Sequence, residues 1–316
     1  MANKLINVDN ISYCGKEAQD IFTQDIYGID LRSYGITFMD GVKGKTKAYS
    51  GQMGDVWQPY TCPFTPEGNV ELGETYLEPA EIKANMEECY DVFWNTFLVE
   101  QTKIALDGGI PQTFSEWFFG QLRQKMDKEY QEIFWQGDSA YTGTTKQFLK
   151  VIDGIEKKLG DDAENIQGAV FTVSNVVAQV EAAVMKSVEV AATNEVDSEN
   201  YKIFMNYNDV KLLEVALGKD CCGTNSTNAI FKNYAKNGDK IIVMGYEVVP
   251  TMQSRNTVIV GPANNLILGF DTEDSRLTYK LIDMRETNGD NMFRVIALSN
   301  IAVGVVLPSL FVYSHV

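Results

Sequence analysis

Histidine is almost absent from this chain of 316 residues, and its absence removes several kinds of chemistry. The only histidine is His315, next to the end of the sequence, so histidine-based general acid–base catalysis has almost no material. The five cysteines show no C-x-x-C spacing, which argues against a Cys/His zinc site. The neighbouring Cys221 and Cys222 are interpreted as free thiols of a reducing compartment rather than a redox device. We therefore expect no bound metal and no cofactor.

Basic residues and long apolar runs are also scarce. There are 27 Lys and Arg against 43 Asp and Glu, a formal net charge of −16 with a sequence pI near 4.5. A surface of that sign repels phosphate backbones and anionic membranes, so we expect neither sequence-specific nucleic-acid binding nor membrane attachment. No stretch approaches the ~18–20 apolar residues of a membrane helix. The first residues also lack a charged leader followed by an apolar run, so we expect a soluble protein that stays where it is made.

Motifs of common enzymes are missing as well. The sequence contains no G-x-G-x-x-G, no Walker loop and no G-x-S-x-G. Nothing singles out a pair of carboxylates for acid–base work. Two acidic clusters are interpreted as exposed loops rather than metal sites: Asp161, Asp162 and Glu164, and Asp271, Glu273 and Asp274. The sequence therefore predicts no catalytic residues and a protein that is not an enzyme.

What remains is the composition of a folded domain, with 45% hydrophobic and 11% aromatic residues. This is enough to bury a substantial core, and the length suits one large domain or two ordinary ones. Residues 1–35 are weakly periodic and read as an extended arm. Residues 36–76 are rich in glycine and proline between short β-prone pieces, which predicts a long two-stranded hairpin. Such an extension buries little of itself, so it is either disordered or covered by another chain.

A long amphipathic helix over residues 113–136 is the clearest local prediction. Thr113 and Glu116 form a capping-box pattern, apolar residues step by four from Phe114 to Phe134, and a glycine follows. Further helices are expected from Pro79 to about residue 101, over 174–192, and over 208–217 with Asn208 as N-cap and Gly218 just past the end. A strand is expected over residues 201–206, and the sequence from residue 240 onward is rich in β-prone segments. Together these elements predict an α+β fold.

The order of these pieces resembles the Hong Kong 97-type major capsid fold, which tailed-phage capsids share with encapsulins, over roughly residues 36–313. In that family an N-terminal arm precedes a hairpin called the E-loop, a long spine helix, and a central domain of helices and strands. The passage GITFMDGVKGKTKAYS…ELGETY resembles the E-loop, and TFSEWFFGQLRQKMDKEYQEIFWQGD resembles the spine. TGTTKQFLKVIDGI, IFMNYNDVKLLEVALGKD and MGYEVVPTMQSRNTVIVGPANNLILGF resemble the passages that follow.

The resemblance implies both an architecture and a function. The expected parts are an arm (1–35), an E-loop hairpin (36–76), a peripheral domain (77–165 and 272–300) and an axial domain (166–271 and 301–316). The implied function is that of a major capsid protein, which self-assembles into hexamers and pentamers of an icosahedral shell around double-stranded viral DNA.

The implied partners are further copies of the chain, a portal protein, and scaffolding or decoration proteins. Packaged DNA would be enclosed without sequence-specific binding, and no membrane is involved. The implied location is the virion capsid, assembled in the cytoplasm of a host bacterium. Two alternatives stay open: an encapsulin-type shell around a cargo enzyme, and a soluble acidic binding protein or enzyme.

Six hairpin residues are the candidates for contacts between subunits. Apolar rings on a poorly buried extension usually contact something else, which singles out Trp57, Tyr60 and Phe64. Lys43, Lys45 and Lys47 would face acidic patches of an adjacent subunit, or water. One branch of the family links a hairpin lysine to an asparagine of a neighbouring subunit, but no local motif identifies either partner here, so no cross-link is assigned.

Overall fold

A computed structural model describes residues 12–14, 30–54, 57, 59–60, 62, 70–90, 97, 114–220, 240–271 and 278–316. The chain divides into two compact units, each built from segments that are far apart in the sequence. Unit 1 comprises residues 1–30, 80–130 and 270–301, and unit 2 comprises residues 31–79, 131–269 and 302–316. The predicted division into peripheral and axial domains stays a prediction.

Unit 1 is built on an antiparallel sheet. Its strands, in spatial order, are β1 (Ser12–Cys14), β12 (Thr278–Asp283), β13 (Met292–Val305) and β5 (Ala80–Cys89). Phe118 and Leu122 of helix α3 (Phe114–Gln136) join Phe293 in the apolar core of this unit. The Phe118 and Phe293 rings meet edge to face, with centroids 4.9 Å apart. The short helix α7 (Met284–Thr287) begins where Asp283 accepts a hydrogen bond from the backbone of Arg285.

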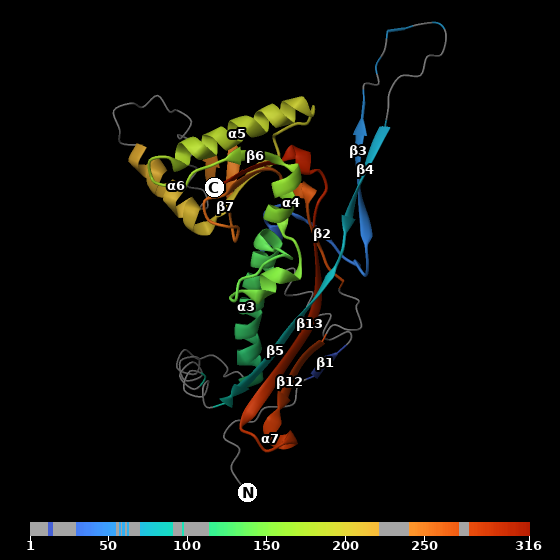
Figure 1. Ribbon diagram of the computed structural model, residues 1–316, viewed down its shortest axis with the longest axis vertical. Coiled ribbons are helices and arrows are strands. Elements are labelled where there is room, and N and C mark those ends of the chain that lie inside the picture. The colour runs from blue at the N-terminus through green and yellow to red at the C-terminus, as the bar shows by residue number, and fades with distance from the viewer. Residues whose placement is uncertain are drawn as a thin grey trace, which may run out of the picture. The chain divides into compact units, whose positions relative to one another are not determined.

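Unit 2 contains a six-stranded mixed sheet with helices packed on it (Figure 1). Its strands, in spatial order, are β6 (Glu164–Gln167), β14 (Val312–His315), β10 (Val258–Pro262), β7 (Tyr201–Asn206), β9 (Tyr246–Thr251) and β8 (Ile241–Val243). Helices α5 (Val176–Thr193) and α6 (Tyr207–Asp220) contribute Val180, Val184 and Leu213 to the core cluster, where all three are fully buried. Apolar burial on this scale is the main source of stability for the unit.

The rest of unit 2 holds a second group of strands. β2 (Thr37–Met39) runs parallel to β11 (Leu266–Gly269), and β11 pairs antiparallel with Ala302–Val305, the last part of β13. β3 (Thr46–Met53) and β4 (Val70–Leu77) pair with each other as a hairpin. The unit also contains helix α4 (Ile155–Asp162) and the 3-10 helices η1 (Asp30–Arg32), η2 (Gln147–Val151), η4 (Ala263–Asn265) and η5 (Pro308–Leu310).

The predicted long helix is confirmed. α3 is one uninterrupted helix of 23 residues, and the predicted helix over 174–192 and strand over 201–206 appear as α5 and β7. Thr113 of the proposed capping box lies outside the described residues. The predicted caps of α6 are wrong: the helix begins at Tyr207, Asn206 Oδ1 accepts a hydrogen bond from the Asn208 N–H at 3.0 Å, and the helix continues past Gly218 to Asp220.

The predicted helix beginning at Pro79 is wrong over Ala80–Cys89, which form β5. Ile82 and Met86 fit a helical spacing, but Ile82, Ala84 and Met86 also fit the alternation of a strand. The strand pattern prevails because β5 pairs with β13 at every one of its ten positions. Most of the predicted helix beyond Tyr90 lies outside the described residues.

Two further interpretations from the sequence need correction. The acidic run at residues 161–164 is not a loop, because Asp162 ends α4 and Glu164 begins β6. Asp271 is buried rather than exposed, and its backbone N–H donates to Asn300 Oδ1 at 2.9 Å. Glu273, Asp274, Cys221 and Cys222 lie outside the described residues.

Candidate functional site: the two faces of the hairpin

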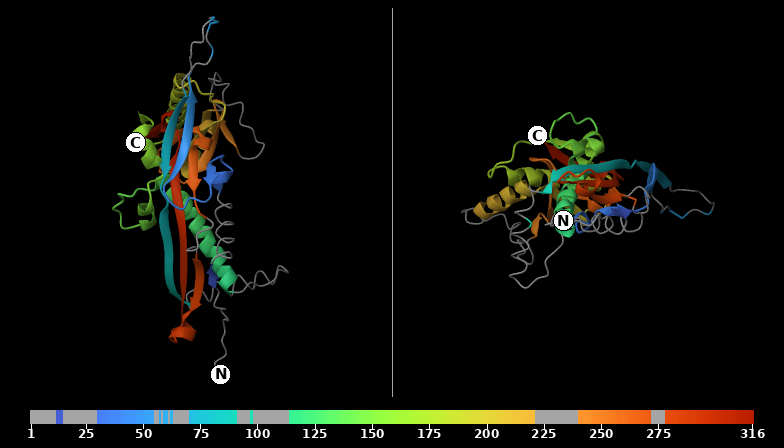
Figure 2. Two further views of the ribbon diagram at one scale, coloured as in Figure 1. Left: turned by 90° about the vertical axis from the view of Figure 1, so that its right-hand side faces the viewer. Right: turned by 90° about the horizontal axis from the view of Figure 1, so that it is seen from below.

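The register of the β3–β4 hairpin gives it two distinct faces. Eight residue pairs run from Thr46 opposite Leu77 to Met53 opposite Val70. Residues that lie opposite each other in an antiparallel pair project to the same face, and successive residues alternate between faces. The pairing begins at Thr46, not at Ile36 as predicted, because Thr37–Met39 forms β2 and pairs with β11. The two strands run side by side in both orientations of the molecule (Figures 1 and 2).

The inner face attaches the base of the hairpin to unit 2. Leu77 is fully buried and Ala48 is nearly so, and both belong to a cluster with Val42, Ile267 and Ala302. The hydroxyl of Thr75 donates to the backbone oxygen of Val306 at 3.1 Å. These contacts hold the base of the hairpin against β11 and the end of β13.

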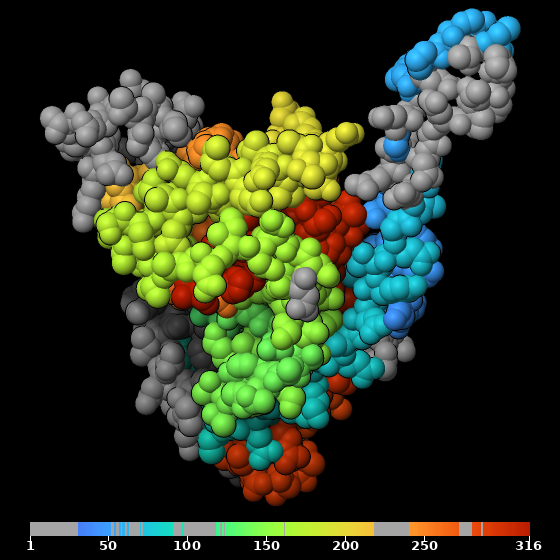
Figure 3. Space-filling model, turned by 45° about the horizontal axis from the view of Figure 1, so that its top comes forward, coloured from blue at the N-terminus to red at the C-terminus, as the bar shows by residue number. Residues whose placement is uncertain are grey.

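The outer face is apolar and open to solvent. It carries four large exposed side chains: Tyr49 (63%), Val70 (57%), Leu72 (71%) and Tyr76 (43%). The space-filling view shows the hairpin, in blue to cyan, projecting from its own unit (Figure 3). Scattered exposed apolar residues are ordinary on a protein surface, but several together on one face of a projecting hairpin mark a site of interaction.

Two ion pairs also lie on the outer face, and one of them lies among the apolar residues, since Lys47 is opposite Tyr76 and Glu74 is opposite Tyr49. Lys45 Nζ lies 2.6 Å from Glu78 Oε1, and Lys47 Nζ lies 2.5 Å from Glu74 Oε2. These hydrogen bonds raise the pKa of both lysines and lower the pKa of both glutamates. The Lys45 ammonium also sits 4.4 Å from the centre of the Tyr76 ring. Because the pairs are exposed they add little stability, but they hold four long side chains in place beside the apolar patch.

Several solved structures have a fold similar to this chain, whereas no family model and no curated protein matches it. A chain from the satellite phage P4 procapsid including size determination (Sid) protein covers 99% of this chain and 93% of its own length, with a TM-score of 0.61 and 12% identity. The capsid of Myoviridae phage XM1 covers 99% and 97%, with a TM-score of 0.54 and 10% identity. The capsid of an empty GTA particle covers 90% and 89%, with a TM-score of 0.51 and 12% identity. This chain has the fold of phage capsids. The predicted α+β fold of the Hong Kong 97 type is thereby confirmed.

In the terms of this fold the β3–β4 hairpin is the E-loop, and α3 is the spine helix. Of the predicted contact residues in the E-loop, Trp57 is 96% exposed and Tyr60 is 93% exposed. Phe64 lies outside the described residues. Lys43 is exposed, whereas Lys45 and Lys47 bind glutamates of their own hairpin. A contact of any of these residues with another subunit stays a prediction.

Sequence reasoning missed the outer-face residues Tyr49, Val70, Leu72 and Tyr76. A signal for them exists, since Val70, Leu72 and Tyr76 occupy alternate positions of one strand. The apolar face can be recognised only when the strand register is known, because the register places Tyr49 on the same face as these residues.

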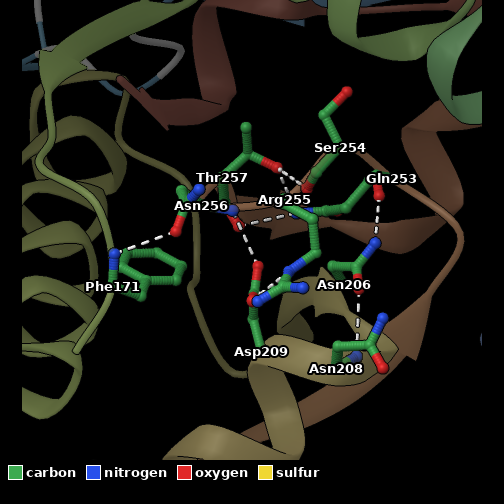
Figure 4. A network of polar contacts seen from close by, with 9 residues as sticks. All are labelled: Phe171, Asn206, Asn208, Asp209, Gln253, Ser254, Arg255, Asn256 and Thr257. Carbon is green, nitrogen blue, oxygen red and sulfur yellow. Dashed lines mark hydrogen bonds and ion pairs between the residues drawn. The ribbon is translucent and has the colours of Figure 1, made fainter. Parts of the chain in front are cut away.

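A polar network of unit 2 shapes the connection between β9 and β10 (Figure 4). Asp209 is fully buried, and its carboxylate accepts hydrogen bonds from Arg255 Nε at 2.6 Å and the Asn256 N–H at 2.7 Å. Asn256 Oδ1 accepts from the Phe171 N–H at 2.9 Å, and the Asn206 amide donates to the Gln253 carbonyl. These hydrogen bonds join residues from several elements, so the network fixes the connection between β9 and β10.

Glu156 of α4 reaches the same connection from the other side. Its carboxylate accepts hydrogen bonds from the backbone N–H and the hydroxyl of Ser254. Burial raises the pKa of Glu156 to about 7, although the two hydrogen bonds act in the opposite direction.

The described part of the chain shows no group of three or more His, Cys, Asp or Glu side chains placed to hold a metal ion. None of its helices has the length and apolar character needed to cross a membrane.

Proposed function

We propose that this chain is the major capsid protein of a tailed bacterial virus, with a structural rather than a catalytic role. Copies of it would assemble into hexamers and pentamers of an icosahedral shell that encloses double-stranded DNA. The observation that carries the proposal is the exposed apolar outer face of the E-loop, in a chain whose fold is that of phage capsids.

The hairpin itself supplies the physical argument. A two-stranded hairpin alone is marginally stable in water, and this one packs on its own unit only through the inner face at its base. The exposed apolar residues of the outer face are therefore suited to contact another subunit. Burying Leu72 or Val70 against a neighbouring subunit would contribute on the order of 1.5–3 kcal/mol for each side chain. The contact is repeated at every subunit of a shell, so a modest contribution per copy stabilises the whole particle.

The remaining parts of the proposal follow from charge and architecture. The net charge of −16 suits a shell protein that encloses DNA at high concentration without adhering to it. The proposed peripheral and axial domains, the portal, scaffolding or decoration partners and the location in the virion all belong to this role.

Substituting the outer face tests the proposal directly. Leu72→Ser removes apolar area from the outer face, and we expect a folded subunit with unchanged far-UV circular dichroism that no longer forms particles. Electron microscopy and sedimentation of the purified wild type and variant measure particle formation. The matched control is Lys83→Ser, an exposed position on β5, which should assemble normally.

Two outcomes would contradict the proposal. A wild-type chain that stays monomeric at micromolar concentration and binds a small ligand would indicate a soluble binding protein. Native particles that contain a cargo enzyme, and neither DNA nor a portal, would indicate an encapsulin.

A further inference from the structure

The side chain of Leu77 occupies space that exists only because residue 304 is glycine. A Cβ atom added to Gly304 would lie 2.2 Å from Leu77 Cδ2 and 3.4 Å from Leu77 Cγ. Leu77 is the last residue of β4, and it is fully buried. The Leu77 side chain at the base of the hairpin therefore packs into the recess that the missing side chain of Gly304 leaves on β13.

The recess is rigid because its walls belong to a paired sheet. Gly304 lies opposite Ile267 in the antiparallel pairing of β13 with β11, and Ala302 lies opposite Gly269. Gly269 is itself tightly packed, since a Cβ there would lie 3.1 Å from both Ala302 Cβ and Val42 Cγ2. A larger residue at position 304 therefore cannot be accommodated by a shift of β13, and Leu77 must move instead.

Leu77 is fully buried in its cluster with Val42, Ile267 and Ala302, so we expect its displaced side chain to shift the end of β4 and with it the direction of the hairpin. Leu72 lies five residues before Leu77 in β4, which is roughly 17 Å at about 3.3 Å per residue. A small rotation at the base is amplified over that length. Between the two, the inner face carries first Thr75 opposite Ala48, which also contact unit 2 at the base. Nearer Leu72 it carries Gly73 opposite Ser50, whose small side chains provide no anchor of comparable size.

We propose that the packing of Leu77 against Gly304 sets the orientation of the hairpin, and so the position of the outer face of the E-loop. Both residues are buried in their own subunit, yet both determine assembly because they fix where Tyr49, Val70 and Leu72 lie. This inference rests on the proposed shell function and adds residues to it that touch no neighbouring subunit.

The experiment compares Gly304→Ala, Leu77→Ala and the double variant with Gly160→Ala. Gly160 is the control, because it lies in α4 outside the hairpin and its added Cβ would meet nothing within 4 Å. We expect Gly304→Ala to raise the concentration needed for assembly by about tenfold, the equivalent of a mild overpacking cost. We also expect it to speed trypsin cleavage at the hairpin lysines of unassembled subunits. The double variant should recover much of the assembly, since the shorter side chain at position 77 leaves room for the new methyl group.

A second control distinguishes an effect on the orientation of the hairpin from an effect on the stability of the subunit. Val180→Ala in the core of α5 should lower the melting temperature at least as much as Gly304→Ala, while still permitting assembly. The inference is overturned if Gly304→Ala assembles like the wild type, or if the double variant assembles no better than Gly304→Ala. It is also overturned if Val180→Ala loses assembly in proportion to its stability. Failure of the wild type to assemble at all would instead contradict the proposed function.

Discussion

At the scale of single residues, two backbone segments of unit 2 approach each other closely where the spine helix ends. A Cβ at Gly137 would lie 2.2 Å from the Ile152 carbonyl oxygen, and one at Gly154 would lie 2.6 Å from the Gly137 nitrogen. The Gly154 N–H donates to the Gly137 carbonyl at 2.8 Å. Two backbone segments thus touch at a point where neither can carry a side chain.

We predict that Gly137→Ala destabilises the subunit by about 1–3 kcal/mol, because the new methyl group clashes with backbone that cannot move freely. Urea unfolding of the variant measures this loss. The control is Gly120→Ala within α3, where an added Cβ meets nothing within 4 Å. That change should stabilise the protein by about 0.5–1 kcal/mol through helix propensity. Equal stability of the two variants would contradict the prediction.

The raised pKa of Glu156 leads to a second prediction, which concerns how the stability of the subunit depends on pH. Its pKa rises from 4.5 in the unfolded chain to about 7 in the folded protein, so the folded state holds a proton that the unfolded state releases between these values. Stability from this group is therefore full below pH 4.5, falls as the pH rises to 7, and stays constant above. The total change is roughly 3 kcal/mol by linkage. The buried phenol of Tyr313, which is near Glu156, does not ionise in this range.

The variant Glu156→Gln keeps an acceptor for Ser254 and cannot ionise. We expect its stability to exceed that of the wild type by an amount that grows from pH 4.5 to 7. Urea unfolding of both proteins across pH 4.5–8 measures this difference, in which the contributions of other carboxylates cancel. A difference that does not vary with pH would show that folding does not raise the pKa of Glu156.

At the scale of elements, what the sequence predicts depends on how local the signal is. α3 and α5 are legible because each carries its periodicity within one segment of sequence. β5 and β6 were missed because their partners β13 and β14 lie far along the chain, and pairing with a distant strand overrides the local pattern. The Leu77–Gly304 contact cannot be predicted from the sequence for the same reason, since no residue near Gly304 in the sequence indicates which side chain packs against it.

The E-loop carries a prediction of its own at this scale. Trp57 is almost fully exposed, so its ring contributes nothing to the packing of its own subunit. We expect Trp57→Ala to leave the far-UV circular dichroism and melting temperature of the subunit unchanged while strongly reducing particle formation. Normal assembly of this variant would make the ring incidental surface, and the contact would then rest on the outer-face residues alone.

At the scale of the whole molecule, the net charge of −16 opposes the gathering of many copies. Raising the ionic strength shortens the screening length from about 10 Å at 0.1 M to about 3 Å at 1 M, and so weakens this repulsion. We predict that the lowest protein concentration at which shells form falls as sodium chloride is raised over this range. Light scattering of purified subunits measures that concentration. A rise with salt would show that attraction between opposite charges, rather than apolar contact, drives assembly.

The alternation of inner and outer residues along the hairpin also determines which substitutions the sequence can tolerate. Along β3 and β4 one residue faces the subunit's own core and the next faces outward, so neighbouring positions are constrained by different contacts. Changes at Ala48, Thr75 and Leu77 would be eliminated because the protein misfolds. Changes at Tyr49 and Leu72 would be eliminated only when a partner copy fails to change with them. Under the proposed shell function, the first set should stay fixed over evolutionary time, while the second changes together with the surface that covers it, so that each lineage would come to accept only its own subunits.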